Sequence, residues 1–205
     1  GDLTQLTQAM KKFMRSSLFF IIPLMTALLI TARPFTLIFL TEKWEPMVPL
    51  LRLLCLVGIL YPIHMVNVQA LTASGRIRQG FTAELIKNGL RISNIIIMSR
   101  YSVIHIVAGE VMVSTLSLFV NTGYTRKYVG YGLLRQLRDM WELIAGGIAA
   151  AMAGYLAYRI APSLWLSLIS GVITVPTVFF LFQYLFNRSL FNELWGFRKL
   201  YKGIK

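Results

Sequence analysis

Charged and amide side chains suited to binding an anion or carrying a proton recur between positions 81 and 100. Members of this polar stripe, at spacings of three and four, are Glu84, Lys87, Asn88, Arg91 and Asn94. Such spacing puts every one of them on one face of a helix. An ionised Lys or Arg at the centre of a membrane helix costs on the order of 2.5 kcal/mol or more, so this face needs a watery cavity, a partner charge or lipid headgroups.

Arg91, Lys87 and Asn94 are the candidate substrate-binding residues of the stripe. Arg91 lies on the order of 15 Å into a hydrocarbon core of ~30 Å, so we expect it to line a cavity or to pair with an acid. Lys87 is nearer the surface and could equally line a cavity or extend its ammonium group to the headgroups. On the opposite face, Gly89 and Ser93 are expected to let a neighbouring helix approach closely.

Two carboxylates are candidates for coupling to an ion or a proton. Glu110 lies within an apolar run, and its alternative role is a salt bridge to Arg91, to Arg100 or to a part of the protein outside this sequence. Glu84 belongs to the polar stripe, where it could instead bridge Lys87 or another neighbour one turn away. The residue types leave both pairs of alternatives open.

Motifs for enzymatic or metal chemistry are lacking in the sequence. His64 and His105 are isolated histidines without metal-ligand spacing, and each is expected to be satisfied by a neighbouring helix. No nucleophile elbow, P-loop, HExxH or paired-carboxylate motif occurs. We therefore expect no enzyme activity, no metal and no cofactor.

Composition indicates the solvent in which these groups must work. Hydrophobic residues make up 56% of the 205 residues and the mean hydropathy is +0.63, which is typical of a membrane protein. The net charge of +13 comes from Lys and Arg placed between apolar runs, which favours membrane lipids over nucleic acid as partners. Cys55, the single cysteine, is expected to be a buried thiol.

The elements that must position the stripe are predicted to be membrane helices. We expect an all-α, polytopic bundle of about six of them, at residues 17–40, 47–72, 81–100, 103–120, 141–160 and 163–186. An amphipathic lead-in over 1–16 should precede them, a connection over 121–139 should lie along the membrane surface, and an amphipathic tail should occupy 187–205.

Prolines and small residues indicate where the predicted helices bend and where they pack closely. Pro23 and the Arg33-Pro34 pair should interrupt the first helix, and Pro23, Pro62 and Pro176 are places where helices could bend between states. Gly146, Ala150 and Gly154 repeat at intervals of four, which is typical of a close helix contact.

Positive charge predicts the orientation. An even number of crossings puts both termini on one side of the membrane. The loops and ends on that side, with the early part of the helix predicted at 81–100, hold sixteen Lys and Arg against five on the other side. The positive-inside rule therefore places both termini in the cytoplasm.

Several short motifs follow one another in a fixed order. They are Glu42-Lys43-Trp44 with Pro46 and Pro49, Leu71-Thr72-Ala73-Ser74-Gly75-Arg76, Glu84-Leu85-Ile86-Lys87, Asn121 through Tyr124 to Lys127, and Gly130-Tyr131 with Gln136-Leu137 and Asp139. With them the chain resembles the C-terminal half of Wzx-type polysaccharide flippases, of the multidrug/oligosaccharidyl-lipid/polysaccharide exporter superfamily. It departs from that family at Thr41, where glycine is common, and near Glu142, where proline is common.

The resemblance implies one lobe, residues 1–205, of a two-lobed bundle whose N-terminal lobe is missing from this sequence. It implies alternating access and a cargo of undecaprenyl-pyrophosphate-linked oligosaccharide, moved across the bacterial inner membrane for lipopolysaccharide, capsule or exopolysaccharide assembly. Arg91 and Lys87 would then contact the pyrophosphate or acidic sugars, and Glu110 would couple to an ion gradient.

Other functions fit parts of the pattern. A cation-coupled exporter of drug-like molecules would share the fold but should have an acidic cavity, whereas this chain is basic. A non-transporting scaffold could dock glycan-assembly enzymes through the tail 187–205. A membrane glycan polymerase or ligase is disfavoured because the sequence has no large polar loop on the periplasmic side.

Overall fold

The computed structural model describes residues 3–187, and that range folds into helices with no β-strand. The elements are α1 (Leu3–Phe39), a short 3-10 helix η1 (Glu42–Met47), α2 (Val48–Ala73), α3 (Ile77–Met98), α4 (Val103–Val129), α5 (Leu133–Ile160) and α6 (Leu164–Phe186). The predicted all-α fold class is confirmed. The predicted tail lies outside the described residues from position 188 onward.

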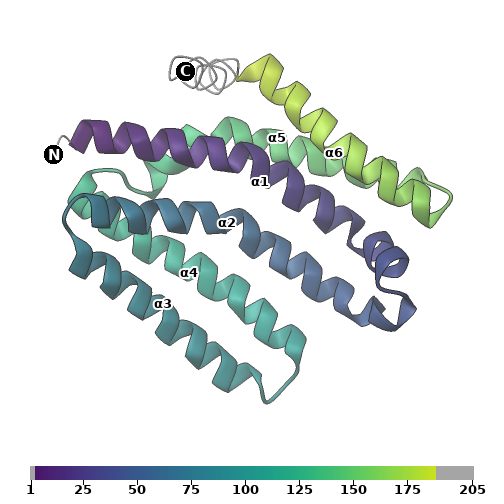
Figure 1. The fold of residues 1–205 in the computed structure, drawn as a ribbon, viewed down its shortest axis with the longest axis horizontal. Coiled ribbons are helices and arrows are strands. Elements are labelled where there is room, and N and C mark those ends of the chain that lie inside the picture. The colour runs from purple at the N-terminus through teal and green to yellow at the C-terminus, as the bar shows by residue number, and fades with distance from the viewer. Residues whose placement is uncertain (1–2, 188–205) are drawn as a thin grey trace, which may run out of the picture.

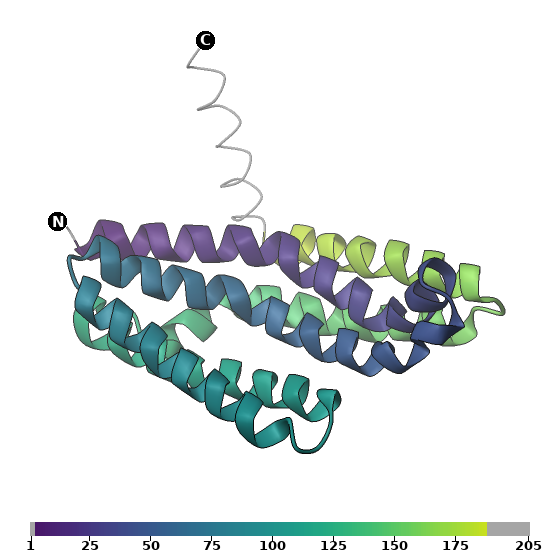
Figure 2. The same cartoon turned by 60° about the horizontal axis from the view of Figure 1, so that its bottom comes forward.

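The helices form antiparallel hairpins packed side by side (Figure 1). α1 and α2 lie in the middle; α3 and α4 pack on the α2 side, and α5 and α6 pack on the α1 side. Figure 2 shows that α3 is an edge helix, and its helix neighbours are α4 and α2. The apolar core is shared by the central pair and the α5–α6 hairpin.

Five of the six long helices are long and apolar enough to cross a membrane: α1, α2 (with η1), α4, α5 and α6. The exception, α3, has Glu84, Lys87 and Arg91 in its middle, so no stretch of membrane-spanning length in it is free of them. The expectation of about six transmembrane helices thus becomes five apolar helices plus one edge helix that carries the polar stripe.

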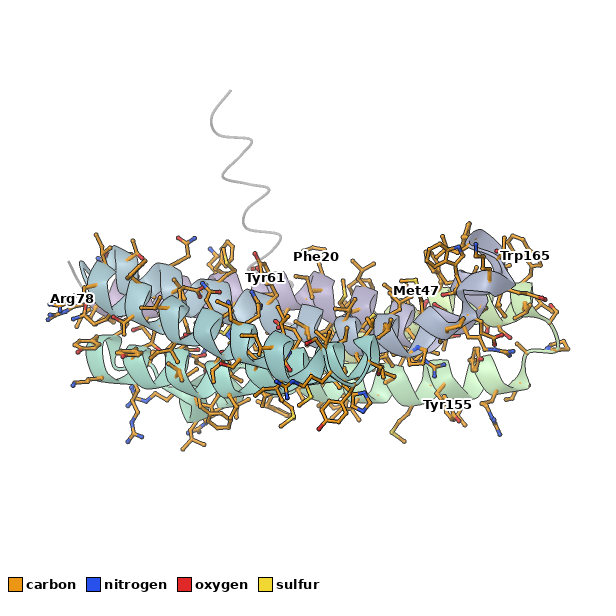
Figure 3. All side chains as sticks on the ribbon, turned by 90° about the horizontal axis from the view of Figure 1, so that it is seen from below. Phe20, Met47, Tyr61, Arg78, Tyr155 and Trp165 are labelled. Atoms are coloured by element: carbon orange, nitrogen blue, oxygen red, sulfur yellow. The ribbon has the colours of Figure 1, made fainter. Side chains whose placement is uncertain are left out.

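Large apolar side chains project from both broad faces of the bundle. In Figure 3, Phe20, Tyr61 and Trp165 lie toward one side and Tyr155 toward the other, and each is more than half exposed. Exposed apolar surface on this scale is what a helix bundle surrounded by hydrocarbon presents.

The first helix is longer than predicted. α1 runs without a break from Leu3 through Pro23 and Pro34, so the predicted helix start at residue 17 and the interruptions at proline are wrong. The reason is packing, because Met10 and Met14 in the lead-in are as buried as Leu18 and join the same core. Its 37 residues give a length of about 55 Å, well beyond a ~30 Å hydrocarbon core.

The prediction of a surface connection over 121–139 is also wrong. α4 continues to Val129 and α5 starts at Leu133, so only a tight turn separates them. Its glycine, Gly130, has φ of 80°, a left-handed conformation that ends α4. The polar residues that suggested headgroup contact, such as Asn121 and Gln136, are instead fully buried against α2.

The predicted small-residue contact of α5 is confirmed. Gly146 and Gly154 are buried, and a Cβ on Gly154 would collide with the side chain of Val175 on α6 and press on Ile30 of α1. α1, α5 and α6 therefore meet at a spot where only hydrogen fits.

We predict that Gly154→Ala destabilises the bundle by about 1–3 kcal/mol, because the added methyl group overpacks this three-helix contact. The measurement is unfolding of the purified protein in mixed micelles, followed by circular dichroism. Gly89→Ala on α3 is the matched control, since nothing lies within 4 Å of a Cβ there and alanine is the better helix former. Equal stability of the two variants would contradict the packing described here.

Candidate functional site

The polar stripe of α3 faces the neighbouring helices. Glu84, Lys87, Arg91 and Asn94 lie on the same side as the buried Ala83, whereas the exposed side is apolar and carries Phe81, Leu85, Ile92, Ile95 and Ile96. Asn88 is exposed and lies outside the inward face. Gly89 and Ser93 are exposed as well, so the expected close helix approach at those two residues is wrong.

Arg91 pairs with Glu110 across the contact between α3 and α4. Its Nε lies 3.1 Å from both carboxylate oxygens of Glu110, and its Nη2 donates a further hydrogen bond to Oε1. The Arg91 side chain keeps 42% of its surface exposed, against 18% for Glu110. Within residues 3–187 the second terminal nitrogen, Nη1, makes no hydrogen bond, so the guanidinium retains an accessible donor edge.

Lys87 forms the second ion pair of the stripe. Its Nζ lies 3.4 Å from Oε1 of Glu84, one turn earlier on the same helix, and its side chain is only 14% exposed. Of the two roles considered for Glu84 in the sequence analysis, the salt bridge to Lys87 is therefore present. With Arg91 and Glu110, the four charges of the cluster cancel, and each cation already has an acidic partner.

Asn94 is engaged in the helix contact. Its Nδ2 donates a 2.9 Å hydrogen bond to the carbonyl oxygen of Ile106, and its carboxamide rests on Gly109. A Cβ at Gly109 would overlap that carboxamide, so glycine is what lets α3 and α4 approach here. In this arrangement the amide of Asn94 holds α3 against α4.

A neutral polar network deeper in the bundle was missed in the sequence. Asn67 of α2 and Gln136 of α5 exchange amide hydrogen bonds of 2.7 and 3.1 Å, and the Oδ1 of Asn67 also accepts from Thr125 of α4 at 2.7 Å. All three side chains are fully buried. Three helices from distant parts of the chain are therefore joined at one point.

The network continues along α4 to a histidine. His64 of α2 contacts the hydroxyl of Ser114 through Nε2 at 3.0 Å and the amide nitrogen of Asn121 through Nδ1 at 3.1 Å. Among residues 3–187, two buried oxygens beside this contact find no hydrogen-bond partner: the Oγ of Ser117 and the Oδ1 of Asn121.

A signal for this network exists in the sequence. From Glu110 onward, one set of polar residues of α4 recurs at spacings of four, three, four and four: Ser114, Ser117, Asn121 and Thr125. The pattern was missed because the fourth helix was predicted to end at residue 120, which separates Asn121 and Thr125 from Ser114 and Ser117. As one helix, α4 presents a continuous polar face to α2 and α3.

A third polar cluster ties α1 to α5. Lys11 forms a 2.7 Å salt bridge with Asp139, whose second oxygen accepts from the hydroxyl of Tyr131 at 2.8 Å. Burial first, and then this hydrogen bond, raise the pKa of Tyr131 above its ordinary value, so its hydroxyl stays a donor at neutral pH. Arg15, itself buried, bonds to both Glu142 and Asn187.

An apolar groove lies between α1 and α2 in the same half of the bundle. Its volume is about 610 Å³, and it runs from Leu6 and Ala73 toward Ile21 and Tyr61. Apart from Ser17, Gln69 and the hydroxyl of Tyr61, its lining is apolar. A hydrocarbon chain suits such a surface better than a polar ligand does.

These features define the class of protein: a multi-pass, all-α membrane protein with a polar interior. A family model described as "Polysaccharide biosynthesis protein" matches residues 1–49, a range that includes α1, η1 and the first two residues of α2. This match agrees with the resemblance at the level of polysaccharide biosynthesis and does not distinguish a Wzx type or a C-terminal half. No curated protein and no solved structure matches the chain.

We predict that Asn67→Leu destabilises the protein by about 1–3 kcal/mol, because it removes the buried hydrogen bonds to Gln136 and Thr125 and leaves the Oε1 of Gln136 without a donor. Unfolding in mixed micelles measures the loss. Asn88→Leu is the control, since Asn88 is exposed on α3. If the network does not stabilise the fold, both variants will be as stable as the wild type.

Proposed function

We propose that this protein moves a lipid-linked oligosaccharide across the bacterial inner membrane, as part of polysaccharide assembly. The family match over residues 1–49 supports the polysaccharide role, and five membrane-crossing helices support a site within the bilayer. The observation that carries the proposal is the Arg91–Glu110 pair, a half-exposed guanidinium held on the polar face of an edge helix.

A pyrophosphate group gives this guanidinium a physical role. Anionic oxygens cannot cross hydrocarbon unaided, and a planar guanidinium binds phosphate oxygens in a two-pronged manner. Arg91 offers the unused Nη1 edge, and Lys87 supplies a second cation one turn away. Asn94, the third proposed substrate-binding residue, would act by fixing α3 in place, because its amide is bonded to α4.

Glu110 and Glu84 hold the two cations in position in this proposal. A carboxylate partner keeps an arginine extended and oriented in an apolar setting, where an unpaired charge would be costly. Ion coupling through either carboxylate stays a prediction, since both are ion-paired in the structure.

The apolar groove between α1 and α2 supports a lipid-linked cargo. It lies in the half of the bundle that carries most of the basic residues. Lys11 and Lys12 are on α1, and Arg76 and Arg78 follow at the turn from α2 into α3. A carrier with a hydrocarbon chain and an anionic headgroup matches an apolar groove near a basic end. The positive-inside rule makes that end cytoplasmic, and both termini share it when α3 crosses as a sixth span beside the five apolar helices.

We predict that Arg91→Ala in the full-length protein lowers surface glycan by roughly 10- to 150-fold, which corresponds to the loss of a hydrogen bond to a charged group of about 1.5–3 kcal/mol. Surface glycan is measured by immunoblot, and membrane protein by a tag on the same chain. Arg100→Ala is the control, because Arg100 is an exposed arginine just beyond the end of α3.

The double variant Arg91→Glu with Glu110→Arg separates binding from structure. It retains an ion pair across α3 and α4 but moves the cation to the other helix, so stability should return while glycan export stays low. Full recovery of export in this variant would show that only the pairing matters, and the proposed contact with the cargo would be wrong.

A further inference from the structure

Two of the short motifs in the sequence have no part in the proposed function: Leu71 to Arg76 and Asn121 to Lys127. Their last residues meet in the structure. The guanidinium carbon of Arg76 lies 5.2 Å from the centre of the Tyr128 ring, and the Nζ of Lys127 lies 5.5 Å from the same centre. Two cations from distant parts of the chain therefore share one aromatic ring, whose face attracts positive charge.

The turn between α2 and α3 fixes the position of Arg76. Gly75 has φ of 76°, a left-handed conformation, and the backbone N–H groups of Gly75 and Arg76 donate to the carbonyl oxygens of Thr72 and Leu71 at 3.0 and 2.8 Å. This pair of bonds is the Schellman motif, which closes the C-terminal end of a helix. Arg76 is thus held at the start of α3 by the backbone, with its side chain over a ring of α4.

Positive charge gathers around this contact. Within residues 3–187, Arg76 and Lys127 form no salt bridge, and neither do the exposed Arg78 and Arg126 that lie close to them in the chain. Figure 1 shows the α2–α3 turn and the end of α4 at the same end of the bundle, and in Figure 3 Arg78 points away from that end. Four cations are therefore open to the surroundings there.

The carboxylates at the same end of the bundle are engaged elsewhere. Asp139 accepts from Lys11 and Glu142 accepts from Arg15, both across the contact of α1 with α5. The first turn of α3 holds no acidic residue. The charge around Tyr128 is therefore not neutralised within the described part of the chain, and an anion from outside would relieve the repulsion among the cations.

The position of Tyr128 along α4 indicates which anion this is. With Val103, the first residue of α4, at the far edge of a ~30 Å hydrocarbon core, Tyr128 lies about 8 Å beyond the near edge, among the lipid headgroups. Tyrosine is typical of that level. Tyr124, one turn earlier, stacks on Tyr128 with ring centres 6.3 Å apart.

An apolar ridge leads from the cations toward the hydrocarbon. Ile77, directly after Arg76, is 64% exposed, and Phe81 and Leu85 follow at intervals of four with 68% and 60% exposed. Residues four apart lie on one face of a helix, so these three side chains form a row on the outer side of α3. A soluble anion would make no use of this row, whereas a phospholipid would pack its acyl chains along it.

We propose that Arg76, Lys127 and Tyr128 form a binding site for the phosphate headgroup of an anionic phospholipid. The phosphate oxygens accept hydrogen bonds from the two cations, which the ring of Tyr128 holds near each other, and Arg78 and Arg126 add to the attraction. The bound lipid joins the start of the edge helix α3 to the end of α4. Headgroup binding of this kind does not require a transported cargo.

Native mass spectrometry of the protein in detergent micelles counts the lipids that stay bound. Phosphatidylglycerol is titrated in parallel with phosphatidylcholine, whose headgroup has no net charge. We expect one phosphatidylglycerol to bind at concentrations where phosphatidylcholine does not. Arg76→Ala and Lys127→Ala should each weaken this first binding step roughly fivefold, the contribution expected of one basic residue at an anionic lipid surface.

Arg138→Ala is the matched control, because Arg138 is an exposed arginine at the same end of the bundle but on another helix, α5. It removes the same charge and should leave the first binding step unchanged. Tyr128→Leu keeps every charge but removes the ring, and should weaken binding as the alanine variants do. Arg76 and Lys127 are exposed, so their variants should unfold like the wild type when no phosphatidylglycerol is present.

An equal loss of binding in Arg138→Ala would show that only the total charge of this end matters, and the assigned site would be wrong. Equal binding of phosphatidylglycerol and phosphatidylcholine would overturn it as well. Two soluble probes test the other sources of negative charge. Inorganic phosphate or poly-glutamate that bound as tightly as the lipid, and was lost in Arg76→Ala, would replace the lipid by a free anion or by an acidic protein.

Discussion

Polar side chains inside a membrane bundle must find their partners within the protein, and this requirement shapes α3 and everything that contacts it. Arg91 and Glu110 form an ion pair between α3 and α4, and Lys87 and Glu84 form one within α3. The outer side of α3 is apolar, so Phe81 and the other exposed side chains there can face hydrocarbon. A helix with three charges in its middle is thereby held at the edge of a bundle whose other long helices are apolar.

Burial distinguishes the two polar clusters that α4 shares with its neighbours. Full charges occur between α3 and α4, where Arg91 retains access to its surroundings, whereas Asn67 and Gln136 use neutral amides in a place that is closed on every side. An unpaired charge is far more costly to bury than an amide, so neutral groups suit the interior contact of α2, α4 and α5. His64 lies between the two clusters, since its ring contacts Ser114, one turn along α4 from Glu110, and Asn121, one turn from Thr125.

Local pattern predicted much of this architecture. Apolar runs located all six helices, the spacing from Glu84 to Asn94 identified the polar face of α3, and the repeat from Gly146 to Gly154 identified a close contact. Partners could not be predicted in the same way. Asn67 and Gln136 are 69 residues apart, and only the packing of α2 against α4 and α5 brings them together. For the same reason the polarity of 121–139 was taken for a surface segment: polarity reveals that a residue needs a partner but not whether that partner is water, lipid or another helix.

The contact between Asn94 and Gly109 fixes the register of α3 along α4. Sliding α3 by one turn, ~5.4 Å, would bring the carboxamide against His105 or Val113, where a side chain occupies the space that glycine leaves open. Small adjustments along the helix axis are blocked in the same manner, because interdigitated helices move between discrete arrangements. A shift of α3 along its own axis must therefore carry α4 with it, so the two helices would slide past α2 as one unit.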